Sequence, residues 1–329
     1  MRLGRGITEG SPHPNPAPLA GGWGLPGEHQ TGPTDIRRGD WVERWLPDWA
    51  EPYARLARLD RPIGTWLLLF PAWWGIALAS PGWPDPVLMV LFALGAVAMR
   101  GAGCTLNDIA DREYDGKVAR TRLRPLPSGR VTVPQAVAFM ILQLAVGAAV
   151  LFSLNRISVL LGIAVLGLIA TYPFMKRITW WPQVFLGLNF NWGALIGWTA
   201  VTGGLAWPPL LLYLGGILWT VGYDTIYAHQ DKADDARIGI KSSALALGDR
   251  TGPLLFAFYG AALVLWAIAG VAAGEGRWFR LALAAATIQL FWQAARVRID
   301  DPADCLAKFR SNRWVGWLIL AGIVAGHLA

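Results

Sequence analysis

The sequence is short of charge, cysteine and histidine. Only 16% of its 329 residues are charged, whereas roughly 25% is usual for a soluble domain. The two cysteines, Cys104 and Cys305, lie far apart and the four histidines are scattered, so the spacing predicts neither a disulfide framework nor a zinc site. Basic residues are not interleaved with aromatic residues as they are in many RNA- or DNA-binding proteins. We therefore expect no nucleic-acid partner.

Alternation of apolar and polar residues with a period of two is also missing, while long apolar runs are abundant. Hydrophobic residues make up 54% of the chain, and a helix needs about 20 residues to cross the hydrocarbon core. In lipid only helices and closed barrels satisfy their backbone hydrogen bonds, so the missing alternation favours helices. The sequence predicts an all-α integral membrane protein with about nine transmembrane helices. The apolar stretches are 62–84, 86–107, 132–154, 157–175, 181–201, 208–229, 253–274, 278–295 and 314–329.

Lysine and arginine fix the expected orientation. They crowd the segment before the first stretch and return in the loops after the second, fourth, sixth and eighth stretches. Because cytoplasmic loops carry the excess of positive charge, we expect a cytoplasmic N-terminus. The basic residues before the first stretch are Arg37, Arg38, Arg44, Arg55, Arg58 and Arg61.

The first part of the chain is rich in proline and glycine and has no apolar core of signal-peptide type. It predicts a flexible tail over 1–45, followed by a transmembrane domain over 46–329. Glu9, Glu28 and Asp35 break the acid-poor pattern of organellar transit peptides. We therefore expect the bacterial inner membrane rather than the mitochondrial inner membrane.

Two apolar stretches end in acidic motifs. The second stretch runs into "NDIADREYD" (107–115) with no helix breaker before Gly116. On a continuous helix Asn107, Asp111 and Asp115 fall within an arc of about 80°, with Asp108 at its edge. The sixth stretch ends in "YDTIYAHQDKADD" (223–235), whose aspartates form a second stripe. These are Asp224, Asp231 and Asp235.

Carboxylates placed together at a helix C-terminus repel one another and the helix dipole unless a cation lies between them. Oxygen ligands of this kind suit Mg²⁺, which binds through a few carboxylates plus substrate phosphates. The ordinary alternative to a metal site is that acidic residues at a helix end are simply solvated. The presence of two such motifs argues against this alternative. The expected Mg²⁺ ligands are Asn107, Asp108, Asp111, Asp115, Asp224, Asp231 and Asp235.

A basic loop with glycine follows each motif, which makes an internal duplication plausible. The loops are "DGKVARTRLRPLPSG" and "DDARIGIKSSALALG". Cations there offset the charge of a diphosphate, and arginine suits bidentate phosphate contacts; the positive-inside rule alone is the alternative. The candidates are Lys117, Arg120, Arg122, Arg124 and Lys241.

Arg100 lies inside the second apolar stretch, seven residues before Asn107. On a helix it shares that residue's face about 10 Å deeper, at 1.5 Å per residue. Arginine in a membrane helix costs at least about 2.5 kcal/mol on insertion scales, so a partner is expected. That partner is either a structural acid or a substrate carboxylate.

Six segments together resemble the UbiA superfamily of intramembrane prenyltransferases, and most closely its hydroxybenzoate branch. The paired aspartate motifs are the most specific of them, and the resemblance covers about 50–329. The remaining segments are "RLDRPIGTWLLLFP" (58–71), "RTRLRPLPSG" (120–129), "YPFMK" (172–176) and "GIKSSALALG" (239–248).

The resemblance implies a Mg²⁺-dependent enzyme that binds polyprenyl diphosphate and 4-hydroxybenzoate at the membrane. The polyprenyl group moves to the ring carbon ortho to the hydroxyl, as in ubiquinone biosynthesis, and diphosphate is released. Both aspartate motifs would hold the metal and act as catalytic residues, with Arg100 as an aromatic-substrate contact. It also implies diphosphate or cation handling by Tyr172 and Lys176, whose alternative is interfacial anchoring. Asn191 could line the pocket, but a hydrogen bond between neighbouring helices is the stronger interpretation.

Two alternatives stay open. Haem, homogentisate, chlorophyll or naphthoate prenyltransferases belong to the same superfamily. An ion-coupled transporter also keeps carboxylates on membrane helices, but near the bilayer midplane, whereas these motifs are predicted at helix ends.

Overall fold

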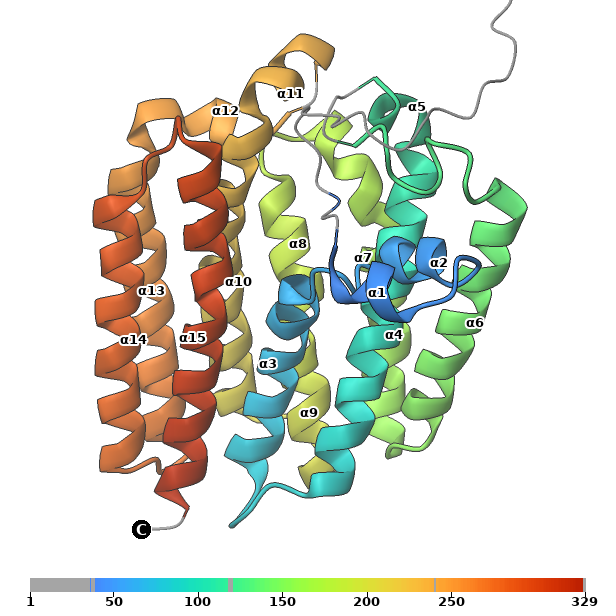
Figure 1. Ribbon diagram of the computed structural model, residues 1–329. Coiled ribbons are helices and arrows are strands. Elements are labelled where there is room, and N and C mark those ends of the chain that lie inside the picture. Colours follow the sequence, from blue (N-terminus) through green and yellow to red (C-terminus); the bar gives the residue numbers. More distant parts are fainter. Residues whose placement is uncertain (1–35, 37–38, 118–120, 240, 328–329) are drawn as a thin grey trace, which may run out of the picture. The chain divides into compact units, whose positions relative to one another are not determined.

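The computed structural model describes residues 36, 39–117, 121–239 and 241–327 (Figure 1). Residues 1–35, which make up most of the predicted tail, lie outside the described residues. Every regular element in the described part is helical, which confirms the predicted all-α class.

Each of the nine predicted apolar stretches overlaps a helix or, for 181–201, a pair of helices that meet at Trp192, although α15 begins well before the stretch 314–329. Four helical segments of the described chain are long and apolar enough to cross a membrane, namely Pro86–Ala110, Val133–Phe152, Pro182–Thr202 and Ser243–Ala272. The number nine and the cytoplasmic N-terminus remain predictions. The long helices are α3 (Ile63–Ala79), α4 (Pro86–Ala110), α6 (Val133–Phe152), α7 (Arg156–Ile178), α8 (Pro182–Asn191), α9 (Gly193–Thr202), α10 (Trp207–Ala228), α13 (Thr251–Ala272), α14 (Arg277–Arg296) and α15 (Pro302–Gly326).

Local sequence sets where several of these helices begin. The α6 helix starts with a capping box in which Thr132 accepts from the backbone of Gln135 and the Gln135 side chain accepts in return. The α4 helix starts at Asp85, whose carboxylate accepts from Val87 N. Proline occupies one of the first two positions of both helices, where its missing N–H costs nothing.

The α3 helix packs against α4, α8, α9, α10 and α15. Its approach to α9 depends on small residues: a Cβ at Gly75 would overlap the carbonyl oxygen of Ala194, and a Cβ at Gly197 would overlap that of Ala72. Close backbone approach of this kind is how membrane helices gain packing energy without a hydrophobic driving force. This close crossing therefore fixes the position of α3 against α9.

Three fully buried tryptophans, Trp74, Trp219 and Trp266, form an aromatic cluster in the main core. Each indole N–H finds an acceptor on another helix: Gly316 O for Trp74, Asn312 Oδ1 for Trp219 and Leu212 O for Trp266. A buried indole without an acceptor costs free energy, so these bonds join α3, α10, α13 and α15 in one arrangement.

Part of the predicted tail is helical. Short helix α1 (Trp41–Trp45) falls inside 1–45, and Asp40 before it pairs with Arg55 of α2 (Glu51–Leu56). On α2, a hydrogen bond from Arg130 holds the pKa of the Glu51 carboxyl below its usual value despite partial burial. These contacts tie the segment before α3 to the loop after the first acidic motif.

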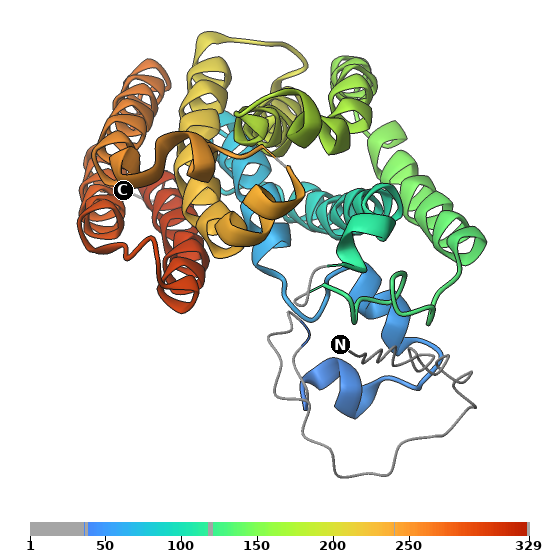
Figure 2. The same cartoon turned by 90° about the horizontal axis from the view of Figure 1, so that it is seen from above.

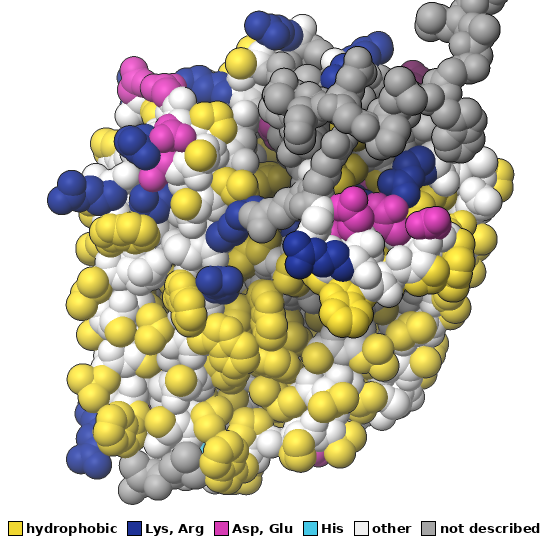
Figure 3. All heavy atoms as spheres, viewed as in Figure 1, with side chains coloured by type: hydrophobic (Ala, Val, Ile, Leu, Met, Phe, Trp, Pro, Cys, Tyr) yellow, Lys and Arg dark blue, Asp and Glu magenta, His cyan; other side chains and the backbone are white. Residues whose placement is uncertain are grey.

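Both acidic motifs lie at one end of the helical bundle. The short helices α5 (Arg112–Asp115), α11 (Lys232–Ile238) and α12 (Ser243–Leu247) follow α4 and α10 at that end (Figures 1 and 2). Figure 3 shows Lys, Arg, Asp and Glu gathered towards this end above a broad apolar surface. Exposed residues such as Ile141, Ile163, Val264 and Ile288 contribute to such surface, which is the expected exterior of a protein solvated by lipid.

Single-cysteine labelling tests the topology. Gly116→Cys and Ala236→Cys lie at exposed positions in the two motif segments, whereas Gly276→Cys lies in the loop between α13 and α14 at the other end. In intact bacterial cells expressing the chain, an impermeant thiol reagent should label Gly276→Cys alone. The buried Cys104 and Cys305 keep the background low. Labelling of either motif variant in intact cells would reverse the predicted orientation.

Candidate active site

The two span helices end within their motifs rather than after them. The α4 helix ends at Ala110, and Asp111 has φ −98° and ψ 5° before α5 begins. The α10 helix ends at Ala228, a 3₁₀ turn covers His229–Asp231, and Asp231 has φ −107° and ψ 3° before α11 begins. The predicted continuous helix through Gly116 is therefore wrong. Both aspartates occupy the bridge region of backbone space, where many active-site residues lie.

Asp108 is fully buried and held by two arginines. Arg58 Nη2 donates to both of its carboxylate oxygens, at 2.6 and 2.8 Å. Arg124 Nη1 lies 3.3 Å from Asp108 Oδ1 and also donates to Asp115 Oδ2 at 2.9 Å. The first motif is thus bound to the segment before α3 and to the basic loop after α5.

Arg58 adopts a conformation that is unusual for its residue type. Its φ is 59°, in the left-handed region, and such strain costs on the order of 1–3 kcal/mol. Its Nη1 donates to Arg55 O at 2.9 Å, and the side chain is largely buried. Sequence reasoning counted Arg58 only as a topogenic charge and missed this pairing, although it lies in the quoted segment 58–71.

The other carboxylates of the first motif also face cations. Arg177 Nη2, from the end of α7, lies 3.6 Å from Asp111 Oδ1, and its guanidinium stacks over the Tyr114 ring. Asp111 is buried, whereas Asn107 and Asp115 are half-buried. Arginines from three separate segments therefore surround this motif, and Arg177 was another residue that the sequence did not single out.

The second motif is held by a buried histidine. Asp224, Asp231 and Asp235 are half-buried, while His229 Nε2 lies 2.9 Å from Thr251 Oγ1 at the start of α13. This bond joins the second motif to the start of α13.

Arg100 lies on α4, and its guanidinium reaches α8. Its guanidinium is 5.3 Å from the centroid of the Phe190 ring, and its Nε is buried without a hydrogen-bond partner in the described part of the chain. Tyr223, which precedes Asp224 on α10, is within electrostatic range of Arg100, Asp224 and Tyr172. Arg100 and the second motif therefore meet around Tyr223.

The remaining candidate substrate-binding residues have different surroundings. Lys117 is over the Tyr114 ring, and Lys241 Nζ donates to Ile178 O at the end of α7. Tyr172 packs against the main core. Arg120 lies outside the described residues, as does the side chain of Lys176.

Asn191 bonds two helices together. It is buried on α8, and its Nδ2 donates to Gly187 O and to Thr220 Oγ1 of α10 at 2.8 Å. Its side chain packs directly against Gly216. This geometry favours the interhelical alternative over a pocket role.

The donor set suits Mg²⁺ by its chemistry, since it consists of carboxylate and amide oxygens from two helix ends. Over the residues that the structure describes, no three His, Cys, Asp or Glu side chains are grouped closely enough to hold a metal ion by themselves. Magnesium at phosphate sites commonly takes one or two carboxylates and completes its shell with substrate oxygens and water. The residues therefore fit a metal that arrives together with a diphosphate.

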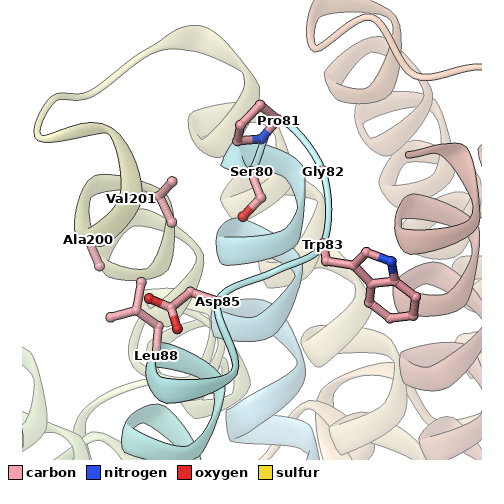
Figure 4. Close-up of a pocket in the computed structure, with 8 residues that line it drawn as sticks. All are labelled: Ser80, Pro81, Gly82, Trp83, Asp85, Leu88, Ala200 and Val201. Atoms are coloured by element: carbon pink, nitrogen blue, oxygen red, sulfur yellow. The ribbon is translucent and has the colours of Figure 1, made fainter. Parts of the chain in front are cut away.

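A pocket of about 530 Å³ lies at the opposite end of the bundle, between the α3–α4 loop and α9 (Figure 4). Its polar side chains are already used: Ser80 Oγ donates to Ile76 O and Asp85 caps α4. The residues that line it do not bring catalytic side chains together.

Comparison with known proteins decides the family. The model of the UbiA prenyltransferase family matches residues 68–324. The chain belongs to this family. The resemblance predicted from the motifs is therefore confirmed, and a UbiA-family chain is an enzyme of prenyl transfer rather than a transporter.

Two relatives carry more specific names. A mitochondrial 4-hydroxybenzoate polyprenyltransferase of Arabidopsis thaliana is 49% identical over 89% of this chain and 72% of its own length. 4-Hydroxybenzoate geranyltransferase 1 of Lithospermum erythrorhizon is 44% identical over 90% of this chain and 97% of its own length. The preference for a bacterial inner membrane has no support here, because the name of the Arabidopsis relative places it in mitochondria.

Solved structures share the UbiA fold. An Aeropyrum pernix UbiA homologue without ligand aligns with a TM-score of 0.69 and 29% identity, over 79% of this chain and 97% of its own. An Archaeoglobus fulgidus homologue, solved with DMAPP and Mg²⁺ bound, aligns with a TM-score of 0.64 and 18% identity, over 83% of this chain and 99% of its own. The integral membrane fold predicted from hydropathy is thus the fold of this UbiA-family chain.

The buried pair of Arg58 and Asp108 predicts a stability effect. Arg58→Met leaves a buried carboxylate short of one partner and should destabilise the fold by on the order of 3 kcal/mol, seen as a lower midpoint of thermal unfolding in detergent. Arg58→Met combined with Asp108→Leu removes both charges and should recover most of that midpoint. Arg298→Met is the control, because its pair with Asp301 is exposed and worth about 1 kcal/mol at most. An Arg58→Met variant as stable as the parent would contradict the pairing of Arg58 with Asp108.

Proposed function

We propose that this chain transfers a polyprenyl group from polyprenyl diphosphate to the ring carbon ortho to the hydroxyl of 4-hydroxybenzoate, releasing diphosphate, in ubiquinone biosynthesis. The observation that carries the proposal is the pairing of two acidic motifs at one bundle end with Arg100 beneath them. The first motif supplies anionic ligands, and the half-buried guanidinium has a buried Nε that bonds to nothing in the described part of the chain. The names of the two relatives support the same acceptor.

In this proposal the two acidic motifs bind the diphosphate through Mg²⁺. We assign the Mg²⁺ ligands to Asn107, Asp111, Asp115, Asp224, Asp231 and Asp235, and the Archaeoglobus homologue solved with Mg²⁺ supports a metal. Bound Mg²⁺ would withdraw charge from the leaving diphosphate and so ease cleavage of the allylic C–O bond. Asp108, whose oxygens already accept from Arg58, is reassigned from ligand and catalytic residue to a group that positions Arg58 and Arg124.

Basic and aromatic residues complete the diphosphate side. Arg124, Lys117 and Lys241 lie at the motif end and offset the charge of the bound diphosphate, with Arg120 assigned the same role from sequence alone. Tyr172, within electrostatic range of Tyr223, and Lys176 are proposed to steady the departing group.

In this proposal Arg100 binds the aromatic acceptor. Its guanidinium would bind the carboxylate of 4-hydroxybenzoate, which leaves the phenol end directed towards the motifs. Cleavage of the C–O bond leaves an allylic cation, the electron-rich carbon beside the phenol oxygen attacks it to form the new C–C bond, and the ring then loses its proton. Water has to be excluded, because it would capture the allylic cation; the apolar bundle and the lipid around the isoprenoid tail serve that purpose.

The membrane location follows from the substrates. The long tail stays in lipid while the charged diphosphate meets the motif end, which is proposed to face the cytoplasm or the corresponding matrix side. Other acceptors used in the superfamily, such as homogentisate or a naphthoate, remain the second candidate function.

An acceptor panel tests the function. Membranes containing the full chain are incubated with Mg²⁺, geranyl diphosphate and either 4-hydroxybenzoate, homogentisate or 1,4-dihydroxy-2-naphthoate. A C-geranylated acid from 4-hydroxybenzoate should dominate, with kcat/KM at least about tenfold above the other acceptors. A higher kcat/KM for either competitor would assign the chain to another branch.

Both motifs should be required. Asp111→Ala and Asp231→Ala should each lower kcat by roughly a thousandfold, because electrostatic stabilisation of the leaving group by a metal is worth several kcal/mol. Asp249→Ala, an exposed aspartate at the same end, is the control and should keep the parent rate. A near-normal rate for either motif variant at saturating Mg²⁺ would contradict the two-motif site.

A further inference from the structure

The guanidinium of Arg100 lies in a slot between two helices. On one side is Gly64 in the first turn of α3, and on the other is the face of Phe190 on α8. A Cβ at Gly64 would lie 2.6 Å from both Nε and Nη2 of Arg100 and 2.8 Å from Cζ. These distances are shorter than any van der Waals contact, so the absence of a side chain at this position creates the space that the guanidinium fills.

The backbone does not require glycine at this position. Gly64 is helical, and its φ lies outside the left-handed region. Alanine would be favoured there by about 1 kcal/mol on helix propensity. Gly75, by comparison, packs against a rigid backbone carbonyl. What a Cβ at Gly64 would meet is the movable end of one side chain, so a substitution should displace Arg100 rather than unfold the bundle.

Phe190 fixes the other wall of the slot. Its ring is 9% exposed, and the Arg100 guanidinium lies over it at 5.3 Å from the centroid. A cation over a ring face gains electrostatic energy but leaves the N–H groups of the guanidinium edge available. Nε is buried on the side of Gly64 and has no hydrogen-bond partner among the described residues.

We propose that Gly64 is a positioning residue for acceptor selection: its missing side chain lets the Arg100 guanidinium lie over the Phe190 ring and donate from there to the acceptor's carboxylate. The inference rests on the proposed function, because it takes Arg100 as the carboxylate contact. It adds that the volume at position 64, a residue that itself touches no reacting atom, determines how strongly the enzyme prefers an acid over a neutral analogue.

The experiment measures that preference. With the full chain in membranes and geranyl diphosphate as donor, kcat/KM is compared for 4-hydroxybenzoate and 4-hydroxybenzamide. Gly64→Ala should raise the KM for the acid about tenfold or more, because displacements near 1 Å at positioned groups carry effects of this size. The ratio of acid to amide should fall with it, while the KM for geranyl diphosphate stays within about twofold of the parent value.

Three further variants make the result decisive. Gly260→Ala, a helical glycine on α13 with open space around it, should keep the parent ratio. Arg100→Ala should abolish the preference for the acid, and Arg100→Lys should retain part of it. Adding Gly64→Ala to Arg100→Ala should change nothing more, because residues that act through one another are not additive.

The outcomes separate the two claims. If Arg100→Ala abolishes the preference while Gly64→Ala leaves it intact, or lowers the rates for acid and amide equally, the proposal for Gly64 is overturned. If Arg100→Ala itself keeps the preference, the assignment of Arg100 within the proposed function fails instead. A loss of thermal stability in Gly64→Ala without a change in the ratio also overturns the positioning role.

Discussion

The carboxylate of Asp108 is fully buried at the end of an apolar helix, and it has to be neutralised there. An unpaired charge in such a place costs several kcal/mol, and the chain meets this cost with Arg58 and Arg124. The requirement draws the segment before α3 and the loop after α5 onto α4. It also holds Arg58 in a left-handed conformation that only a strong partner sustains. The end of the bundle that carries the motifs is organised around Asp108 and these two arginines.

The same constraint explains how acidic motifs coexist before substrate arrives. Arg124 joins Asp108 to Asp115, and Arg177 faces Asp111. Guanidinium groups thus offset carboxylates that would otherwise repel one another. Under the proposed function, a divalent cation arriving with a diphosphate would bring both charges at once, and the arginines and aspartates would exchange partners. Arg100, seven residues before Asn107 on α4, lies over the Phe190 ring.

Hydropathy predicted the helices well because crossing lipid leaves few alternatives: each apolar stretch lies in helix within a few residues. The motif residues and their common end also followed from sequence. Three things did not. The backbone breaks at Asp111 and Asp231 because local propensity does not register a bridge-region residue. The partner of Asp108 comes from fifty residues away, and a period along one helix cannot reveal it. Asn191 joins α8 to α10, a choice that depends on which helix lies opposite.

The central claim is that the motif end binds a prenyl diphosphate only together with a divalent cation. Titration of the purified full chain with an unreactive thio analogue of geranyl diphosphate tests this directly, in Mg²⁺ and again in excess EDTA. We predict saturable binding with Mg²⁺ that is lost in EDTA and lost in Asp231→Ala. Equal affinity with and without Mg²⁺ would contradict the account, because the arginines alone would then form the diphosphate site.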